Sequence, residues 1–362
     1  MKIAALQMVA TPDVERNLAA ATRLIAQAAD AGATLVALPE YFCLMGHHDR
    51  DKLAIAEVAG AGPIQDSLSA AARRHGLWVI GGTLPIRSAD ADHVYNACCV
   101  YGPDGMQAAR YDKIHLFCFD NGRERYDEGR VLIGGSEPVA FSAAVAGAVA
   151  GSPAPIRVGL SICYDLRFPE LYRALMAMPG QPPCDLIAVP AAFTHTTGQA
   201  HWELLLRARA VENQCYVIAA AQGGLHENGR RTWGHSMVID PWGEVLAVQP
   251  EGRAWCWPSS MWSGLRLCVR SCLRWRTGGQ TGGSESGGGL SCRGCDHLRD
   301  GRGELLAVGH MQELVRPVRI ALRAEHAAHH HLRGREAALQ QAHQRDRAAL
   351  ADVAAVGAEV LL

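Results

Sequence analysis

Lysine is almost absent from this sequence. Of the 35 basic residues, only Lys2, Lys52 and Lys113 are lysines, and the others are arginines. Arginine cannot replace lysine where a compact ammonium or a proton-transferring amine is required. A lone lysine is usually a surface residue, but that interpretation is weaker in a chain that almost avoids lysine.

Long apolar runs and an excess of charge of either sign are also missing. The formal net charge is −1, so the composition gives no argument for a nucleic-acid or anionic-membrane partner. No apolar run approaches the length of a membrane span. The start of the chain has a strand pattern and lacks the features of a signal peptide, and twelve scattered cysteines favour reduced thiols. We therefore expect a cytoplasmic protein without nucleic-acid or membrane partners.

Strand and helix patterns alternate up to about residue 252. The expected strands cover residues 2–9, 34–38, 77–84, 95–101, 106–111, 139–141, 156–163, 184–190, 215–221 and a hairpin over 234–248. The expected helices cover residues 14–31, 63–75, 169–178 and 201–213. Helices that alternate with buried strands and hairpins indicate an α/β protein with mixed sheets and helices on their outer faces.

The pattern is lost in residues 253–362. This part contains fifteen arginines, and residues 277–289 have the composition of a flexible linker. Cys292 and Cys295 have zinc-knuckle spacing without a second pair, and the histidines at 329–331 are no stronger a metal signal. A basic nucleic-acid arm is an alternative. We prefer the hypothesis that the tail is disordered or translated out of frame behind a hydrolase domain at 1–252.

Three chemically versatile residues follow apolar strand patterns. They are Glu40, Lys113 and Cys163. Cys163 lies in a strand–turn–helix pattern in which Pro169 begins the helix, and the positive end of a helix favours the nucleophilic thiolate. Taken singly, a buried structural cysteine and a solvated loop glutamate are the commoner interpretations.

Together the three residues provide the groups that acyl transfer from an amide requires. A thiolate attacks the carbonyl, a carboxylate transfers protons and an ammonium stabilises the oxyanion. Residues that follow strands also tend to meet at one edge of a sheet. The triplet at 47–49, His-His-Asp, has no further ligands at a recognised spacing. We therefore expect neither a metal nor a cofactor.

Three motifs, in this order, resemble the nitrilase superfamily of carbon–nitrogen hydrolases. They are Leu38-Pro-Glu40, the Asp-Lys-Ile-His-Leu-Phe run at 112–117 and the Ser-Ile-Cys-Tyr-Asp-Leu-Arg-Phe-Pro-Glu run at 161–170. The resemblance covers residues 1 to about 250 and implies a four-layer α-β-β-α sandwich with two mixed sheets, usually dimeric. The segments at 200–222 and 233–243 resemble most the Nit branch, whose amidases cleave deaminated glutathione to 2-oxoglutarate and cysteinylglycine.

The resemblance also implies catalytic roles. Cys163 is the nucleophile and forms a thioester, while Glu40 is the general base for the thiol and later for water. Lys113 stabilises the oxyanion together with the backbone N–H of Tyr164. Glu128 orients the substrate or Lys113.

Three further residues are implied as substrate contacts. Phe193 and Thr194 follow a strand and line the pocket. Arg167 binds a substrate carboxylate, because a guanidinium forms two parallel hydrogen bonds with a carboxylate. An internal ion pair of Arg167 with Glu170 or Asp165 is an equal alternative.

The sequence leaves other functions possible, and it departs from the family pattern in one segment. An ω-amidase acting on 2-oxoglutaramate, or a broader aliphatic amidase or nitrilase, would use the same three residues, and an inactive binding module is a non-enzymatic alternative. The last strand of the family and its C-terminal segment have no evident counterpart after about residue 252. We expect a homodimer unless this altered C-terminus prevents it.

Overall fold

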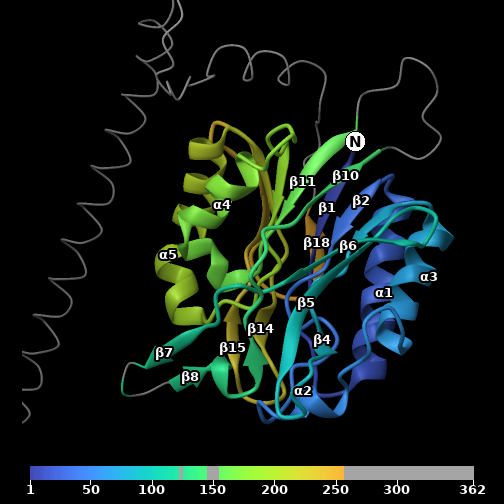
Figure 1. Ribbon diagram of the computed structural model, residues 1–362, viewed down its shortest axis with the longest axis vertical. Helices are drawn as coiled ribbons and strands as arrows, with labels where there is room; N and C mark the ends of the chain where they lie inside the picture. The colour runs from blue at the N-terminus through green and yellow to red at the C-terminus, as the bar shows by residue number, and fades with distance from the viewer. Residues whose placement is uncertain (121, 123–124, 145–154, 257–362) are drawn as a thin grey trace, which may run out of the picture. The chain divides into compact units, whose positions relative to one another are not determined.

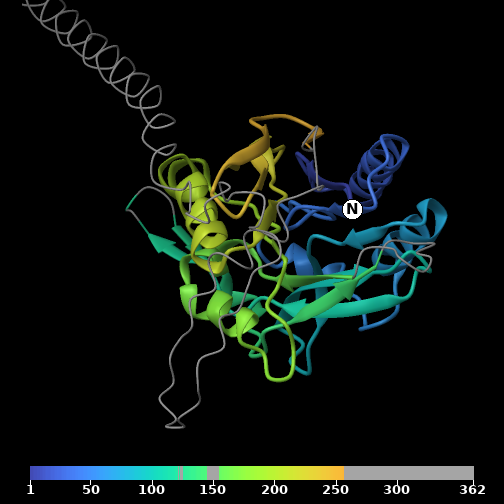
Figure 2. The same cartoon turned by 90° about the horizontal axis from the view of Figure 1, so that it is seen from above.

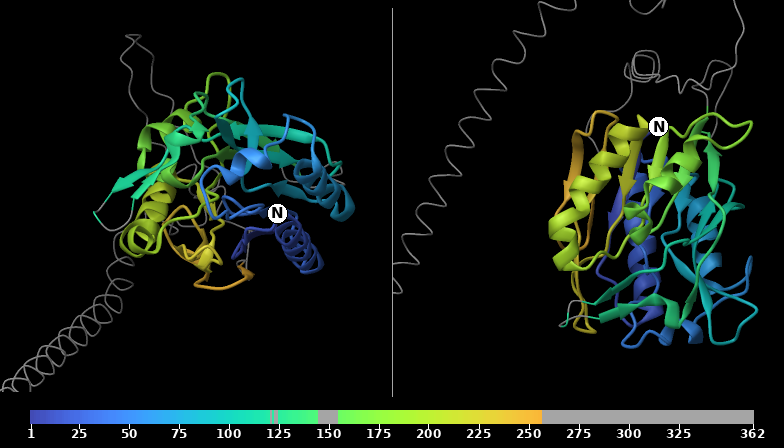
Figure 3. Two further views of the ribbon diagram at one scale, coloured as in Figure 1. Left: turned by 90° about the horizontal axis from the view of Figure 1, so that it is seen from below. Right: turned by 60° about the vertical axis from the view of Figure 1, so that its left-hand side comes forward.

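The computed structural model describes residues 1–120, 122, 125–144 and 155–256. Two β-sheets pack face to face, and each carries a helical layer on its outer face (Figure 1). The same order of layers is seen from above in Figure 2 and in the two views of Figure 3. The expected four-layer α-β-β-α arrangement with mixed sheets is therefore confirmed.

The first sheet has a parallel centre and antiparallel margins. In spatial order its path is β18 (Ala254–Cys256), β1 (Ile3–Gln7), β2 (Leu35–Ala37), β3 (Trp78–Ile80), β5 (Val94–Tyr101) and β4 (Leu84–Arg87), with β6 (Gln107–Asp112) and β9 (Leu132–Ile133) also paired to β5. Alternate residues of β1 face opposite layers, as the pleat of a strand requires. Ile3 and Ala5 pack toward the second sheet, whereas Ala4 and Leu6 pack beneath the helices.

The second sheet follows the same plan. Its order is β10 (Ala140–Ala143), β11 (Ile156–Leu160), β12 (Leu186–Ala188), β13 (Tyr216–Ala219), β16 (Ser236–Ile239) and β17 (Val245–Gln249). The strands β11, β12 and β13 are parallel, and β10, β16 and β17 pair antiparallel at the two sides. The turn expected before β17 is present, because the N–H of Gly243 donates to the carbonyl of Asp240 at 2.9 Å.

The helices of the outer layers are α1 (Val14–Asp30) and α3 (Pro63–His75) on one side and α4 (Pro169–Met176) and α5 (His195–Asn213) on the other; α2 (Asp51–Ala54) is short. Asp13 caps α1, and its side chain accepts from the N–H of Arg16 at 3.0 Å. The expected start of α5 at residue 201 is wrong by six residues. The polar residues that suggest a loop form its first turns, and Gly198 lets the helix approach Trp233, whose Cβ would lie 2.3 Å from an added Cβ.

Two short hairpins complete the described fold. They are β7 (Cys118–Asp120) with β8 (Arg125–Asp127) and β14 (Gly223–Leu225) with β15 (Arg231–Trp233). The β14–β15 hairpin was not expected, because its two three-residue strands, Gly-Gly-Leu and Arg-Thr-Trp, lack the apolar alternation that predicts strands. No helix in the described part of the chain is long and apolar enough to cross a membrane.

The regular sheet continues past residue 252, where we expected it to end. Strand β18 pairs antiparallel with β1, with Ala254 opposite Gln7 and Cys256 opposite Ala5. A strand of three residues is too short for its alternation to be recognised in the sequence. The linker predicted at 277–289, the cysteines at 292 and 295 and the histidines at 329–331 lie outside the described residues.

Candidate active site

Both sheets contribute to the candidate site. Glu40 follows β2 and Lys113 follows β6, both in the first sheet, whereas Cys163 follows β11 in the second. The two sheets pack against each other, so residues far apart in the sequence meet near the ends of these strands. Glu128 begins the short 3₁₀ helix η1 (Glu128–Arg130) after strand β8.

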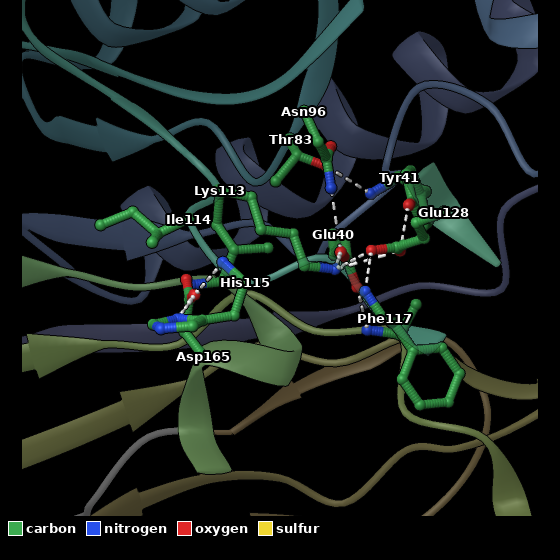
Figure 4. Close-up of polar contacts among 12 residues, drawn as sticks. Glu40, Tyr41, Thr83, Asn96, Lys113, Ile114, His115, Phe117, Glu128 and Asp165 are labelled. Carbon is green, nitrogen blue, oxygen red and sulfur yellow. Dashed lines mark hydrogen bonds and ion pairs between the residues drawn. The ribbon is translucent and has the colours of Figure 1, made fainter. Parts of the chain in front are cut away.

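Lys113 lies between two carboxylates. Its Nζ is 2.8 Å from Oε1 of Glu40, and 2.7 Å and 3.0 Å from the two carboxylate oxygens of Glu128 (Figure 4). Its side chain is fully buried. Burial alone lowers the pKa of Lys113, but the negative charges of Glu128 and Glu40 outweigh this effect and raise it. Lys113 therefore carries its proton throughout the neutral pH range and is a fixed positive charge.

Glu128 is held as an anion. Burial alone raises its pKa, but the ammonium of Lys113 and hydrogen bonds from the N–H of Phe117 and the hydroxyl of Tyr41 lower it overall. The Tyr41 hydroxyl donates at 2.7 Å and the Phe117 N–H at 2.8 Å (Figure 4). These contacts fix the carboxylate of Glu128 against the ammonium of Lys113.

The carboxylate of Glu40 accepts three hydrogen bonds. Besides Lys113, Oε1 accepts from Nδ2 of Asn96 at 3.0 Å (Figure 4), and Oε2 accepts from the N–H of Ala192 at 2.9 Å. Gln222 also donates to the backbone carbonyl of Glu40 at 3.0 Å. Glu40 is thus fixed at both its backbone and its side chain, which suits a group that must transfer protons in one geometry.

Cys163 lies in a strained turn. Its φ is +49°, in the left-handed region that a non-glycine residue rarely adopts, and its N–H donates to the carbonyl of Pro190 at 2.8 Å. It begins the 3₁₀ helix η2 (Cys163–Arg167). Such strain is retained where the surrounding structure fixes a side chain in position.

The surroundings of Cys163 favour its thiol, whereas the helix terminus considered in the sequence would favour the thiolate. Burial raises its pKa well above the ordinary value, and the charge of Glu40 raises it further, while Lys113 and the N–H of Ala192 oppose the rise only in part. Cys163 is only 8 % exposed, and this burial is the largest cause of the raised pKa. A nucleophile in this state requires a general base to remove its proton.

Asp165 supports the turn that carries Cys163. Its carboxylate accepts from the N–H of Ile162 at 2.8 Å and from the Tyr111 hydroxyl at 2.7 Å. It also contacts the N–H of His115 at 3.0 Å and Nδ1 of His115 at 2.7 Å (Figure 4). The loop after Lys113 and the turn at Cys163 are thereby joined through one buried carboxylate.

A pocket opens beside these residues. Its lining includes all five of the residues proposed as substrate contacts, namely Glu128, Tyr164, Arg167, Phe193 and Thr194, together with Glu40 and Cys163. The alternative ion pairs of Arg167 with Glu170 or Asp165 are absent among the described residues. Arg167 instead lies 3.4 Å from Nδ1 of His201 and over the rings of Tyr164 and Phe193.

Several residues of the site were not predicted from the sequence. Asn96 lies inside strand β5, and a buried amide in an otherwise apolar strand was the available signal. Ala192 acts through its backbone N–H, which no side-chain pattern reveals. Arg230 lies before β15, in the hairpin that was not expected, and also lines the pocket.

Within the described residues, no three histidine, cysteine, aspartate or glutamate side chains are grouped closely enough to hold a metal ion. The residues at 47–49 are exposed. The expectation that the reaction needs neither metal nor cofactor stays a prediction.

Comparison with known proteins places these features in a family. The carbon–nitrogen hydrolase family model matches residues 2–254. A deaminated glutathione amidase from Synechocystis is 42% identical over 247 residues, which cover 67% of this chain and 85% of the relative. The omega-amidase NIT2 of Xenopus tropicalis is 37% identical over 247 residues, which cover 68% of this chain and 83% of that protein.

The fold has solved counterparts as well. The crystal structure of the C. elegans NitFhit protein superposes with a TM-score of 0.60 at 37% sequence identity, and the match covers 71% of this chain and 59% of that one.

Proposed function

The chain belongs to the carbon–nitrogen hydrolase family, and we propose that it is an amidase in which Cys163 attacks the substrate carbonyl. The observation that supports this most is the position of Lys113, buried between Glu40 and Glu128 where Glu40 and Cys163 line one pocket. A neutral thiol, a fixed carboxylate and a fixed ammonium form a set that is suited to acyl transfer.

In the acylation half-reaction, Glu40 removes the proton of the Cys163 thiol as Sγ bonds to the amide carbon. The carbonyl oxygen becomes an oxyanion, which Lys113 Nζ and the N–H of Tyr164 stabilise. Tyr164 lies in the first turn of η2, where N–H groups lack partners within the helix. When the carbon–nitrogen bond breaks, Glu40 returns the proton to the leaving nitrogen, and the acyl group is held as a thioester.

In the deacylation half-reaction, the same groups act on water. Glu40 removes a proton from a water molecule whose oxygen bonds to the thioester carbon. The second oxyanion collapses, the carbon–sulfur bond breaks, and Glu40 returns the proton to Sγ. The products are a carboxylic acid and the free Cys163 thiol.

We propose deaminated glutathione as the substrate, with 2-oxoglutarate and cysteinylglycine as the products. The names of relatives at up to 42% identity support it, and an arginine in the pocket suits a carboxylate. 2-Oxoglutaramate is the second candidate, because an omega-amidase is also among the relatives.

A two-substrate assay separates these candidates. Purified protein is given deaminated glutathione or 2-oxoglutaramate, and released 2-oxoglutarate is measured, with Cys163→Ala as the control. We expect the higher kcat/KM with deaminated glutathione and no turnover by the variant. A higher kcat/KM with 2-oxoglutaramate would make the protein an omega-amidase, and full activity of the variant would contradict the mechanism.

Four wider expectations belong to the same proposal. We propose that the enzyme acts in the cytoplasm on a small-molecule amide and forms a homodimer. We also propose that the sequence after the described residues is an out-of-frame tail, which sequencing of the gene would test. An intact native reading frame through codon 362 would contradict the last point.

A further inference from the structure

The pocket contains positive charge that the protein itself does not neutralise. Four charged side chains line it, namely Glu40, Glu128, Arg167 and Arg230. Both carboxylates are bound to Lys113, at 2.8 Å and 2.7 Å. With this lysine included, the formal charges leave one positive charge in excess, and neither arginine forms an ion pair with a described residue.

Arg230 is held by its backbone in the β14–β15 hairpin. Its N–H donates to Oδ1 of Asn228 at 2.9 Å, and its carbonyl accepts from the N–H of His226 at 2.9 Å. These two hydrogen bonds fix the backbone position of Arg230, and with it the Cα atom from which the side chain extends. The guanidinium then lies 5.2 Å from the ring centre of Tyr126.

The guanidinium of Arg230 is only partly satisfied. Nη2 donates to the carbonyl of Ala192 at 3.1 Å, but Nε is buried and has no hydrogen-bond partner among the described residues. A buried donor without an acceptor costs free energy. The acceptor that matches a guanidinium best is a carboxylate, which can bind two of its nitrogens at once.

The two arginines reach the pocket from different elements. Arg167 ends η2, four residues after Cys163, and lies over the rings of Tyr164 and Phe193. Arg230 comes from the hairpin and binds the carbonyl of Ala192, whose N–H donates to Glu40. The two guanidinium groups therefore enter the pocket from different parts of the chain and have different neighbours.

We propose that Arg230 binds a second carboxylate of the substrate, on the other side of the scissile amide from the carboxylate that Arg167 binds. The site then selects amides that carry a carboxylate on both the acyl part and the amine part. This inference rests on the proposed amidase function and makes Arg230 a specificity-determining residue. Deaminated glutathione has such a pair of carboxylates, whereas 2-oxoglutaramate has one.

A binding experiment with matched ligands tests the proposal without turnover. The full-length Cys163→Ala protein is titrated calorimetrically with deaminated glutathione and with its derivative in which the glycine carboxylate is a primary carboxamide. The titrations are repeated with Arg230→Gln and, as a neighbouring control, Arg231→Gln in the same background. Arg231 is exposed, pairs with Glu251 at 3.0 Å and is not among the residues that line the pocket.

We expect the acid to bind about 10- to 100-fold more tightly than the carboxamide, the range for a charge-assisted hydrogen bond. Arg230→Gln should reduce this ratio to about 1, and Arg231→Gln should leave it unchanged. If Arg230 only positions Ala192, Arg230→Gln would weaken both ligands equally, and that result would overturn the proposal. An unchanged ratio, or no binding of either ligand, would overturn it too.

A separate measurement of turnover distinguishes a failure of the proposed amidase function from a failure of the proposed role of Arg230. If the Cys163→Ala protein binds the acid with the expected ratio but the unmodified enzyme does not hydrolyse it, the proposed function fails and the role of Arg230 stands. If the enzyme hydrolyses deaminated glutathione and its carboxamide equally well, with equal affinities, the function stands and the role of Arg230 is refuted.

Discussion

At the scale of single residues, the buried neutral thiol of Cys163 determines what its neighbours must do. Because its pKa is raised well above the ordinary value by burial, the resting enzyme contains little thiolate at neutral pH. Proton removal and attack must therefore be coupled through a base. In the mechanism that we propose, Glu40 takes this proton, and Lys113 keeps its positive charge for the oxyanion.

The first prediction concerns Glu40→Gln. The amide can still accept a hydrogen bond from Lys113 but cannot take the thiol proton, so we expect kcat to fall at least about 100-fold. Thermal unfolding should show that the variant is folded. Glu57→Gln is a matched control, because Glu57 is also buried but accepts from the N–H groups of Ile64 and Gln65 outside the pocket. A kcat for Glu40→Gln within threefold of the original would exclude Glu40 as the base.

The second prediction concerns Lys113→Met, which leaves two buried carboxylates without their cation. Breaking a buried ion pair in this way costs about 3–5 kcal/mol of unfolding free energy, and activity should be lost with the oxyanion partner. Urea denaturation measures the first effect. Adding Glu128→Gln removes one of the two charges and should restore part of the stability. A loss below about 1 kcal/mol in the single variant would contradict the charge arrangement described here.

At the scale of elements, the β14–β15 hairpin depends on one buried histidine. Nδ1 of His226 is 2.8 Å from the carbonyl of Ala10 and Nε2 is 2.8 Å from the hydroxyl of Thr232. The first contact requires a donor, and the second lets the ring accept from the hydroxyl, so the neutral tautomer fits both. Burial lowers the pKa of His226 to about 4.

The third prediction follows from that lowered pKa. The unfolded chain binds this proton near pH 6.5 and the folded protein only near pH 4, so the contribution of neutral His226 is complete above pH 6.5. It is lost as the pH falls from 6.5 to 4, by up to about 3 kcal/mol. Unfolding free energies at pH 7 and pH 4.5 should show a smaller acid loss in His226→Gln than in the original chain. An equal loss of unfolding free energy in the variant and in the original chain would refute the stabilising role of neutral His226.

The elements also show which parts of the secondary structure could be predicted from the sequence alone. Long apolar-periodic segments were predicted closely, and α3 has the expected bounds of 63–75. The β14–β15 hairpin and the start of α5 were missed because glycine and polar residues there pack against tertiary neighbours, as Gly198 does against Trp233. Tertiary contacts of this kind leave no periodic signal.

The candidate site likewise contains residues that the sequence identified and residues that only the structure revealed. Glu40, Lys113 and Cys163 were identifiable because each follows a predicted strand and lies in a motif that resembles the nitrilase superfamily. Ala192 and Arg230 were not, since one acts through its backbone and the other depends on where a hairpin folds. The charge state of Cys163 also required the structure, because burial decides it.

At the scale of the whole molecule, an apolar patch lies on the outer surface of α5. Leu204 and Val211 are 67% and 49% exposed, and Trp242 is 65% exposed in the adjoining turn. That turn contacts the helix, because Nε of Arg207 donates to the carbonyl of Gly243 at 2.7 Å. Clustered apolar surface of this kind is typical of an interface between protein chains.

The fourth prediction assigns the proposed dimer to this α5 patch. Light scattering should give about twice the chain mass of 38.8 kDa for the original protein and a monomer for Leu204→Glu, since a charge would be buried in the interface. Met106→Glu is the matched control, because Met106 is 65% exposed outside the patch. A dimeric Leu204→Glu protein would place the interface elsewhere, and a monomeric original protein would contradict the dimer.

The central claim is that Cys163 carries the acyl group during turnover, and trapping that intermediate tests it most directly. Full-length protein is mixed with deaminated glutathione, quenched in acid during the steady state, digested and analysed by mass spectrometry. We predict a 2-oxoglutaryl group on the peptide that contains Cys163, and neither adduct nor product with Cys163→Ala. Product released by the Cys163→Ala protein, or an acyl group found on a different cysteine, would contradict the claim.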